Sequence, residues 1–164
     1  MKILQYLFIT FSHNILKLLP YTLIKVLSVP IGTLYFLLTF RSSIKLFKRR
    51  ELFKKLKINY KPLIVKINYT RYWLETLWLT NKNFSKHITP HVEIENQEYV
   101  EKLKKQYPGL IFALPHLGNW EFAIPIGNSI KLNLLAVAEP LDNSYVLNWF
   151  KSLRESLGIE IIIG

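Results

Sequence analysis

Residues 110–121 read LIFALPHLGNWE, in which five apolar residues are followed by a short stretch that contains a proline, a glycine and three polar residues. A continuous apolar run of this length is typical of a strand buried on both faces of a parallel sheet. Pro115 cannot continue a strand ladder, and Gly118 with Asn119 favours a turn that ends in a helix N-cap. The stretch therefore predicts a strand, a loop and the start of a helix.

The same alternation continues to the last residue. Residues 119–130 have a helical pattern interrupted by Pro125, residues 132–138 read LNLLAVA, residues 144–158 again suit a helix, and residues 159–164 read IEIIIG. Apolar runs joined by helices indicate parallel strands. We expect an α/β fold with a mostly parallel sheet covered by helices on both faces, in which ligands bind beyond the carboxyl ends of the strands.

Upstream of this region the pattern is more helical. Apolar residues spaced by three and four predict a helix over residues 63–77, whose aromatic side chains we interpret as packing residues. Residues 91–96, HVEIEN, alternate as a strand does. Residues 98–106 predict a polar surface helix that Pro108 and Gly109 end.

The first forty residues are the most apolar part of the chain. Two uncharged runs, residues 3–16 and 26–40, are shorter than the roughly 20 apolar residues that a membrane-spanning helix needs. Pro20 and Pro30 interrupt them, which favours two short helices in the membrane interface or a shallow hairpin. The alternative is a pair of buried core helices.

Positive charge is concentrated next to these apolar residues. The net charge is +11, and residues 41–71 alone carry +10. Such a stretch can be a solvated face, a nucleic-acid patch or a membrane-facing patch, but basic residues that directly follow an apolar anchor favour anionic lipid headgroups. We expect no nucleic-acid partner, because no nucleic-acid-binding motif accompanies the charge.

The length of 164 residues suits one domain with its own core. We divide it into membrane-associating apolar helices over residues 1–40 and an α/β domain over residues 41–164. The absence of cysteine excludes disulfides and thiolate metal sites and fits a reducing compartment.

His116 and Glu121 are the residues best suited to chemistry. A carboxylate that binds one ring nitrogen leaves the other free to take a proton from a hydroxyl group. The alternative is a structural histidine that caps the following helix, and the residues alone favour neither interpretation.

The histidine and glutamate belong to a larger pattern. RYWLE at 71–75, ALPHLGNWE at 113–121, AEPL at 138–141 and WFKSLRESLGIEII at 149–162 occur in the order seen in one family. The chain resembles the bacterial lipid acyltransferases that include lipid A lauroyl transferases and phosphatidylinositol mannoside acyltransferases, and it looks most like the second group. This resemblance implies a glycerol-3-phosphate acyltransferase-like fold.

The resemblance also implies a reaction and its residues. A fatty acyl chain would pass from a thioester, acyl-CoA or acyl carrier protein, to a sugar hydroxyl of a membrane glycolipid, with no bound cofactor or metal. His116 would act as general base and Glu121 would orient it. Glu139, Arg154 and Asn119 would contribute to substrate binding, and an ion pair or a headgroup contact would suit the first two.

Location and extent follow from the same resemblance. The protein would lie on the cytoplasmic face of a bacterial inner membrane, attached peripherally or by its N-terminus. Members of the family are considerably longer, so we expect this chain to be the N-terminal part of an enzyme. Glu121, where mannoside enzymes often have aspartate, leaves lipid A as an alternative acceptor. A non-catalytic module that binds anionic membrane or nucleic acid through residues 41–71 is the alternative outside enzymes.

Overall fold

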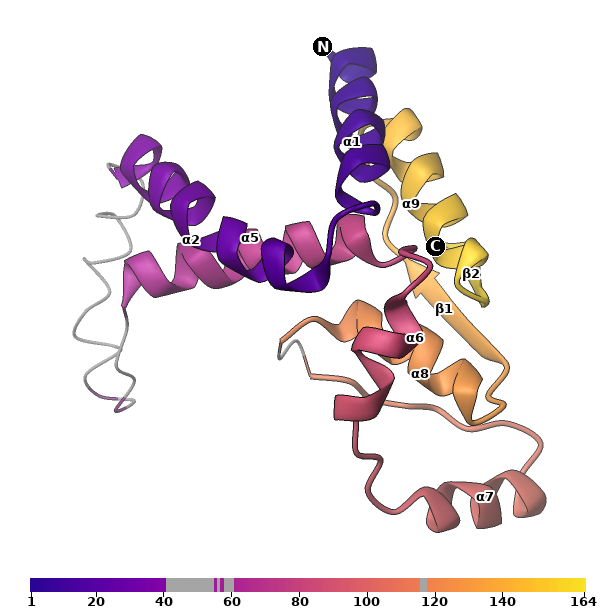
Figure 1. The fold of residues 1–164 in the computed structure, drawn as a ribbon. Helices are drawn as coiled ribbons and strands as arrows, with labels where there is room; N and C mark the ends of the chain where they lie inside the picture. The colour runs from indigo at the N-terminus through magenta and orange to yellow at the C-terminus, as the bar shows by residue number, and fades with distance from the viewer. Residues whose placement is uncertain (41–54, 56, 58–60, 116–117) are drawn as a thin grey trace.

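A computed structural model describes residues 1–40, 55, 57, 61–115 and 118–164, which form a mainly helical structure with a small parallel sheet (Figure 1). The elements in chain order are α1 (Lys2–Leu16), α2 (Tyr21–Leu38), α5 (Pro62–Trp78), α6 (Phe84–His87), the 3₁₀ helix η1 (Thr89–His91), α7 (Gln97–Gln106), the 3₁₀ helix η2 (Trp120–Phe122), α8 (Ala123–Ser129), β1 (Leu134–Ala138), α9 (Ser144–Ser156) and β2 (Ile159–Ile163).

The N-terminal region forms two helices, and Pro20 is the N-cap of the second, as predicted, but the prediction that Pro30 interrupts a helix is wrong. α2 continues through Pro30 and packs along α5 (Figure 1). The helices approach so closely at Gly32 that an added Cβ would lie 2.6 Å from Ile67 Cα. This packing favours continued helix despite the one backbone donor that proline lacks. Among the helices of the described residues, α2 is the one that is long and apolar enough to cross a membrane, judged by length and composition only.

The core that joins α2 to α5 is built around Trp78. This indole is fully buried against Ile24 of α2 and Phe84 of α6, and its Nε1 donates to the Leu19 carbonyl oxygen at 2.8 Å. Burying a large aromatic side chain with its polar atom satisfied is strongly favourable. The predicted helix over residues 63–77 is confirmed as α5, and Trp78 holds its C-terminal end in this core.

α1 lies along α9, although the two helices are far apart in sequence (Figure 1). Asn143, the N-cap of α9, accepts from the Tyr145 amide at 3.2 Å and donates from Nδ2 to the Lys2 carbonyl oxygen at 2.9 Å. The oxygen and the nitrogen of the Asn143 side-chain amide are therefore both hydrogen-bonded, which ties the first turn of α1 to the start of α9.

Two of the predicted apolar runs form the sheet. β1 and β2 are parallel, with Leu134 opposite Ile159 at one end and Ala138 opposite Ile163 at the other. The crossover between them is α9, as the alternation predicts. One face of this pair packs against Ile124 of α8.

The other face of the described sheet is uncovered, so the expectation of helices on both faces is wrong for these residues. Val137 is 70% exposed, and Leu135 and Ile162 are also exposed. The sheet covers its apolar residues only on the face that packs against α8, which precedes β1, and α9, which joins β1 to β2. A larger α/β acyltransferase sheet stays a prediction.

Residues 110–114 are not a strand. This segment has no ladder partner among the described residues, and Ile111 is fully exposed. A cavity of about 670 Å³ is lined by the segment and by Leu134–Ala136 of β1. Composition favours an extended conformation, but a strand also needs a paired neighbour, and Pro108 and Pro115 remove donors at both ends.

The prediction of a strand over residues 91–96 is also wrong. His91 closes η1, and the residues that follow lead through a turn into α7. Asn96 adopts a left-handed conformation with φ of 57° directly before that helix, which an alternating strand does not accommodate. The predicted polar helix over residues 98–106 is confirmed as α7.

Candidate active site

The start of η2 presents the carboxylate predicted from the sequence. Gly118 has a φ of +63°, and Asn119 is the N-cap of η2, as the turn signals predict. The Asn119 Oδ1 accepts from the Glu121 amide at 3.2 Å. A 3₁₀ turn then passes into α8, where Pro125 lies in the first turn and removes no required hydrogen bond. The interruption of the helix that was predicted at Pro125 lies instead at Phe122, where η2 passes into α8.

Glu121 forms a bidentate ion pair with Arg154 of α9. The Arg154 Nη2 lies 2.6 Å from Glu121 Oε1, and its Nε donates to Oε2 at 3.1 Å. The glutamate is 0% exposed, so its charge would be costly without a partner. Charge-assisted, forked pairing of this kind fixes the plane of the carboxylate as well as its position.

Aromatic side chains hold the arginine from two sides. The guanidinium carbon lies 5.0 Å from the ring centroid of Trp120 and 5.5 Å from that of Phe150. A guanidinium is planar and weakly hydrated, so it packs on aromatic rings while its edge donates hydrogen bonds. Arg154 is therefore positioned by η2 and by its own helix at once.

Tyr72 of α5 reaches the same carboxylate. Its hydroxyl donates to Glu121 Oε1 over a long 3.5 Å. Burial, together with the negative charge of Glu121, raises the pKa of Tyr72 above its ordinary value. The phenol therefore stays protonated at neutral pH and can keep donating.

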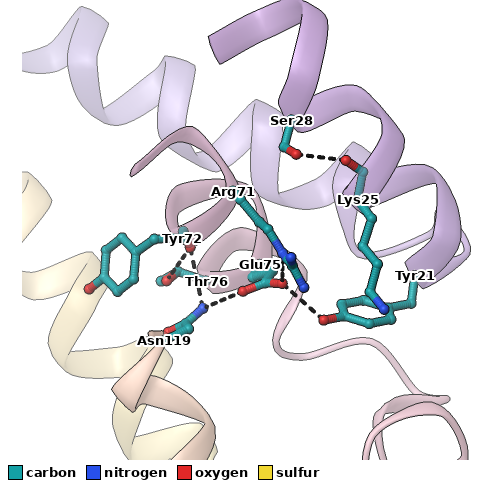
Figure 2. A network of polar contacts seen from close by, with 8 residues as sticks. All are labelled: Tyr21, Lys25, Ser28, Arg71, Tyr72, Glu75, Thr76 and Asn119. Atoms are coloured by element: carbon teal, nitrogen blue, oxygen red, sulfur yellow. Dashed lines mark hydrogen bonds and ion pairs between the residues drawn. The ribbon is translucent and has the colours of Figure 1, made fainter. Parts of the chain in front are cut away.

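Asn119 connects the loop to α5. Its Nδ2 donates to the Tyr72 carbonyl oxygen and to Glu75 Oε2, each at 3.4 Å (Figure 2). Its other amide atom caps η2, so both polar ends of the side chain are occupied within the protein. Asn119 therefore fixes the position of η2 relative to α5.

A cavity of about 340 Å³ lies beside this group. Arg154 and Trp120 line it, with Glu139 at the carboxyl end of β1. The rest of the lining is mainly apolar and comes from α5, β1, the loop after β1, α9 and β2. These residues are Trp73, Ala136, Val137, Ala138, Leu141, Leu147, Phe150, Ile159, Ile161 and Ile163, together with Tyr72 and Lys151. An apolar pocket with a few convergent charged groups is typical of a ligand site.

The structure brings together most of the residues predicted for the site. Glu121, Asn119 and Arg154 lie in one hydrogen-bonded group, and Glu139 lines the adjoining cavity. Arg154 pairs with Glu121. His116 lies outside the described residues, as do most of residues 41–71.

Sequence reasoning missed Tyr72 and Glu75 as members of this group. Both belong to the RYWLE stretch, whose aromatic residues were interpreted as packing, and a carboxylate four residues after Arg71 on an apolar helix was the available signal. In the described part of the chain, no group of three or more histidine, aspartate or glutamate side chains could hold a metal ion.

Comparison with known proteins identifies a family. The sequence profile of the family described as bacterial lipid A biosynthesis acyltransferase matches residues 2–163. Comparisons with curated proteins and with solved structures yield no significant match.

Proposed function

The chain belongs to the bacterial lipid A biosynthesis acyltransferase family, and from this premise we propose that it transfers a fatty acyl chain from a thioester to a sugar hydroxyl of a membrane glycolipid. Members of this family are enzymes that transfer acyl groups in lipid biosynthesis. The thioester donor, the sugar hydroxyl and the residue roles that follow belong to the proposal.

The observation that carries the proposal is the burial of Glu121. Glu121 has no exposed surface for direct contact with a substrate, which supports the proposed role of orienting another group. Arg154 occupies one acceptor position on each oxygen, and Tyr72 occupies a second on Oε1, out of about four in all. Among the described residues this leaves a position on Oε2, which allows Glu121 to accept a hydrogen bond from His116, five residues earlier in the chain.

In the proposed reaction, His116 is the general base. Its imidazole takes the proton of the acceptor hydroxyl as that oxygen attacks the thioester carbonyl carbon. The carbon–sulfur bond then breaks, and the departing thiolate takes the proton from the imidazolium. No covalent enzyme intermediate is required, because a thioester is already activated and positioning supplies much of the rate.

The cavity beside Arg154 is suited to a substrate with an apolar part and a polar head. Its apolar lining would hold an acyl chain, while Glu139, Lys151 and the exposed edge of Arg154 would contact sugar hydroxyls or phosphate oxygens. The donor would be acyl-CoA or acyl carrier protein. Asn119 is assigned a positioning role here, because its amide is already occupied.

We propose an acceptor that resembles phosphatidylinositol mannoside. A lipid A precursor is the second candidate, and two observations favour it: the description of the matching family and the glutamate at position 121. Both acceptors present a sugar hydroxyl at a membrane surface, so the proposed chemistry is the same.

Membrane attachment would come from the N-terminal helices. α1 and α2 expose many apolar side chains, among them Phe8, Phe11, Leu34 and Leu37. Residues 41–71 add a charge of +10, which anionic headgroups attract by about 1 kcal/mol for each basic residue near the surface. We propose that the enzyme works at the cytoplasmic face of the inner membrane.

The test is an acceptor panel. The purified protein, expressed from its natural reading frame, is incubated with radiolabelled palmitoyl-CoA, or with palmitoyl-acyl carrier protein, and with phosphatidylinositol mannosides, lipid A precursors or non-glycosylated phospholipids as acceptors. We expect labelled product only with the glycolipids. Transfer to phospholipid alone, or to none of the acceptors, would show that the proposed function is wrong.

The matched variant is His116→Ala. We expect turnover to fall about a hundredfold or more, because a general base contributes roughly that factor. Far-ultraviolet circular dichroism establishes that the variant is folded. Near-normal turnover in a folded His116→Ala variant would remove His116 from the reaction.

A further inference from the structure

Glu75 is a second buried carboxylate, which the proposed reaction does not use. It is 4% exposed and accepts hydrogen bonds from three different parts of the chain (Figure 2). Its Oε1 accepts from Arg71 Nε at 2.8 Å and from the Tyr21 hydroxyl at 2.9 Å. Its Oε2 accepts from Asn119 Nδ2 at 3.4 Å. One side chain therefore joins α2, α5 and the loop before η2.

The orientation of the Asn119 amide follows from its partners. The Glu121 backbone N–H can only donate, so it requires the amide oxygen. The Glu75 carboxylate and the Tyr72 carbonyl oxygen can only accept, so both require the amide nitrogen. Without the negative charge of Glu75, only the neutral Tyr72 carbonyl oxygen would still require the nitrogen on that side. Glu75 thus supplies the charged part of the preference for the orientation in which Asn119 caps η2.

The Asn119 cap fixes the backbone of Glu121, from which the side chain extends. Arg154 fixes the Glu121 carboxylate, whereas Asn119 holds the Glu121 backbone nitrogen. The first constraint comes from α9, and the second comes from the N-cap of η2, which α5 holds through Glu75 and Tyr72. Loss of the Asn119 hydrogen bond would let η2 shift while the ion pair between Glu121 and Arg154 remained.

We infer that Glu75 is a positioning residue for acyl transfer, which acts through Asn119 on the backbone that presents Glu121. This inference rests on the proposed function, since acyl transfer is its readout. Glu75 itself is 4% exposed, and its carboxylate accepts from Arg71, Tyr21 and Asn119, so we assign it no direct contact with substrate.

A reversal of hydrogen-bond polarity tests this role. Glu75→Gln keeps the shape of the side chain, and its oxygen still suits Arg71 and Tyr21, but its amide nitrogen then faces the amide nitrogen of Asn119. Asn119→Asp alone places two carboxylates against each other, while aspartate still caps η2. In the double variant, the introduced glutamine donates to the introduced aspartate, and that aspartate accepts from the Glu121 amide as asparagine does in the wild type. The hydrogen bond from position 119 to the Tyr72 carbonyl oxygen stays lost.

We expect each single variant to lower kcat about tenfold with KM changed less than about threefold, because misplacement of a supporting group acts on the reacting geometry. We expect the double variant to recover part of kcat, because it restores the hydrogen bond between positions 75 and 119 but not the one to the Tyr72 carbonyl oxygen. Activities are normalised to the folded fraction, which urea unfolding of each variant provides. A purely structural role for the buried charge would lower stability in Glu75→Gln, but the double variant would then not restore kcat.

The control is Glu101→Gln on α7. Glu101 is half-exposed, and its carboxylate pairs with Lys104 at 3.2 Å, so the same chemical change is made away from the site. We expect wild-type kcat. If Glu75→Gln does not fold, Asn119→Asp still decides the question, because it leaves the Glu75–Arg71 pair intact.

Two failures are distinguishable. A wild-type chain without acyl transfer to any acceptor overturns the proposed function and, with it, this role of Glu75. An active wild type together with folded single variants of unchanged kcat, or with a double variant no better than the single variants, overturns the role of Glu75 alone.

Discussion

Arg154 and Glu121 form a bidentate ion pair in which the shorter contact, Nη2 to Oε1, is 2.6 Å and the glutamate has no exposed surface. The two residues are 33 positions apart and belong to different helical elements. A buried pair of this kind adds little net stability over an apolar pair, but the loss of one partner leaves an uncompensated buried charge.

We therefore expect Arg154→Met to lower the free energy of unfolding by about 3–5 kcal/mol. Urea unfolding followed by tryptophan fluorescence measures it. Lys151→Met, on the same helix, is the control: Lys151 lies 3.7 Å from Glu155 in an exposed pair, and we expect a change within about 0.5 kcal/mol. Adding Glu121→Gln to Arg154→Met should recover part of the loss. A cost below about 1 kcal/mol for Arg154→Met would contradict the pairing.

The contact between α2 and α5 gives a second prediction. Gly32→Ala places a Cβ 2.6 Å from Ile67 Cα, so the helices must separate, and overpacking of this kind costs about 1–3 kcal/mol. Thermal unfolding in mild detergent measures the change. At Gly109 an added Cβ meets nothing within 4 Å, so Gly109→Ala should be nearly neutral. Equal melting temperatures for the two variants would argue against close helix packing at Gly32.

His13 of α1 predicts a dependence of stability on pH. Its Nδ1 lies 2.8 Å from the Leu77 carbonyl oxygen, which can only accept, so Nδ1 carries the proton, and Nε2 accepts from Thr80 Oγ1 at 3.3 Å. Burial lowers the pKa of His13 below its ordinary 6.5, against the opposing effect of the Leu77 hydrogen bond, and the charge of Lys17 lowers it further.

A histidine with a lowered pKa in the folded state binds its proton more tightly when the chain is unfolded. Its contribution to stability is therefore complete above the unfolded pKa of 6.5 and is lost as pH falls from there through the folded pKa. We expect the urea midpoint to fall between about pH 7.5 and pH 5 by more in the wild type than in His13→Gln. His91→Gln, at an exposed position, should behave as the wild type does. Identical slopes for wild type and His13→Gln would show that His13 does not contribute.

Vesicle binding tests the concentration of positive charge in residues 41–71. We expect the chain to bind anionic vesicles more tightly than neutral ones, with the difference shrinking as salt rises. Replacing Lys48, Arg49 and Arg50 by glutamine should weaken binding to anionic vesicles about a hundredfold, from about 1 kcal/mol for each charge. The same replacement of three lysines on α7, at positions 102, 104 and 105, should have a small effect. Equal losses from both triple variants would mean that only the total charge matters.

The local features of this protein follow from the sequence by itself. The turn signals at Gly118 and Asn119 give the cap of η2, because positive φ and side-chain capping depend on residues two or three positions apart. The apolar runs that form β1 and β2 and the helix between them follow from residue periodicity. Glu121, Arg154 and Asn119 were identified as site candidates through the motifs that contain them.

Only the tertiary structure decided which of these residues meet. The sequence allows either an acidic residue or a lipid headgroup as the partner of Arg154, and the packing of α9 beside η2 makes it Glu121. Glu75 contacts Asn119 although the two residues are 44 positions apart. Residues 110–114 have a strand composition but no ladder partner among the described residues, and α2 stays helical through Pro30 where it packs on α5. The physical reason is the range of the forces: propensities and caps act over a few residues, whereas ladder pairing, helix packing and buried ion pairs depend on segments that only folding brings together.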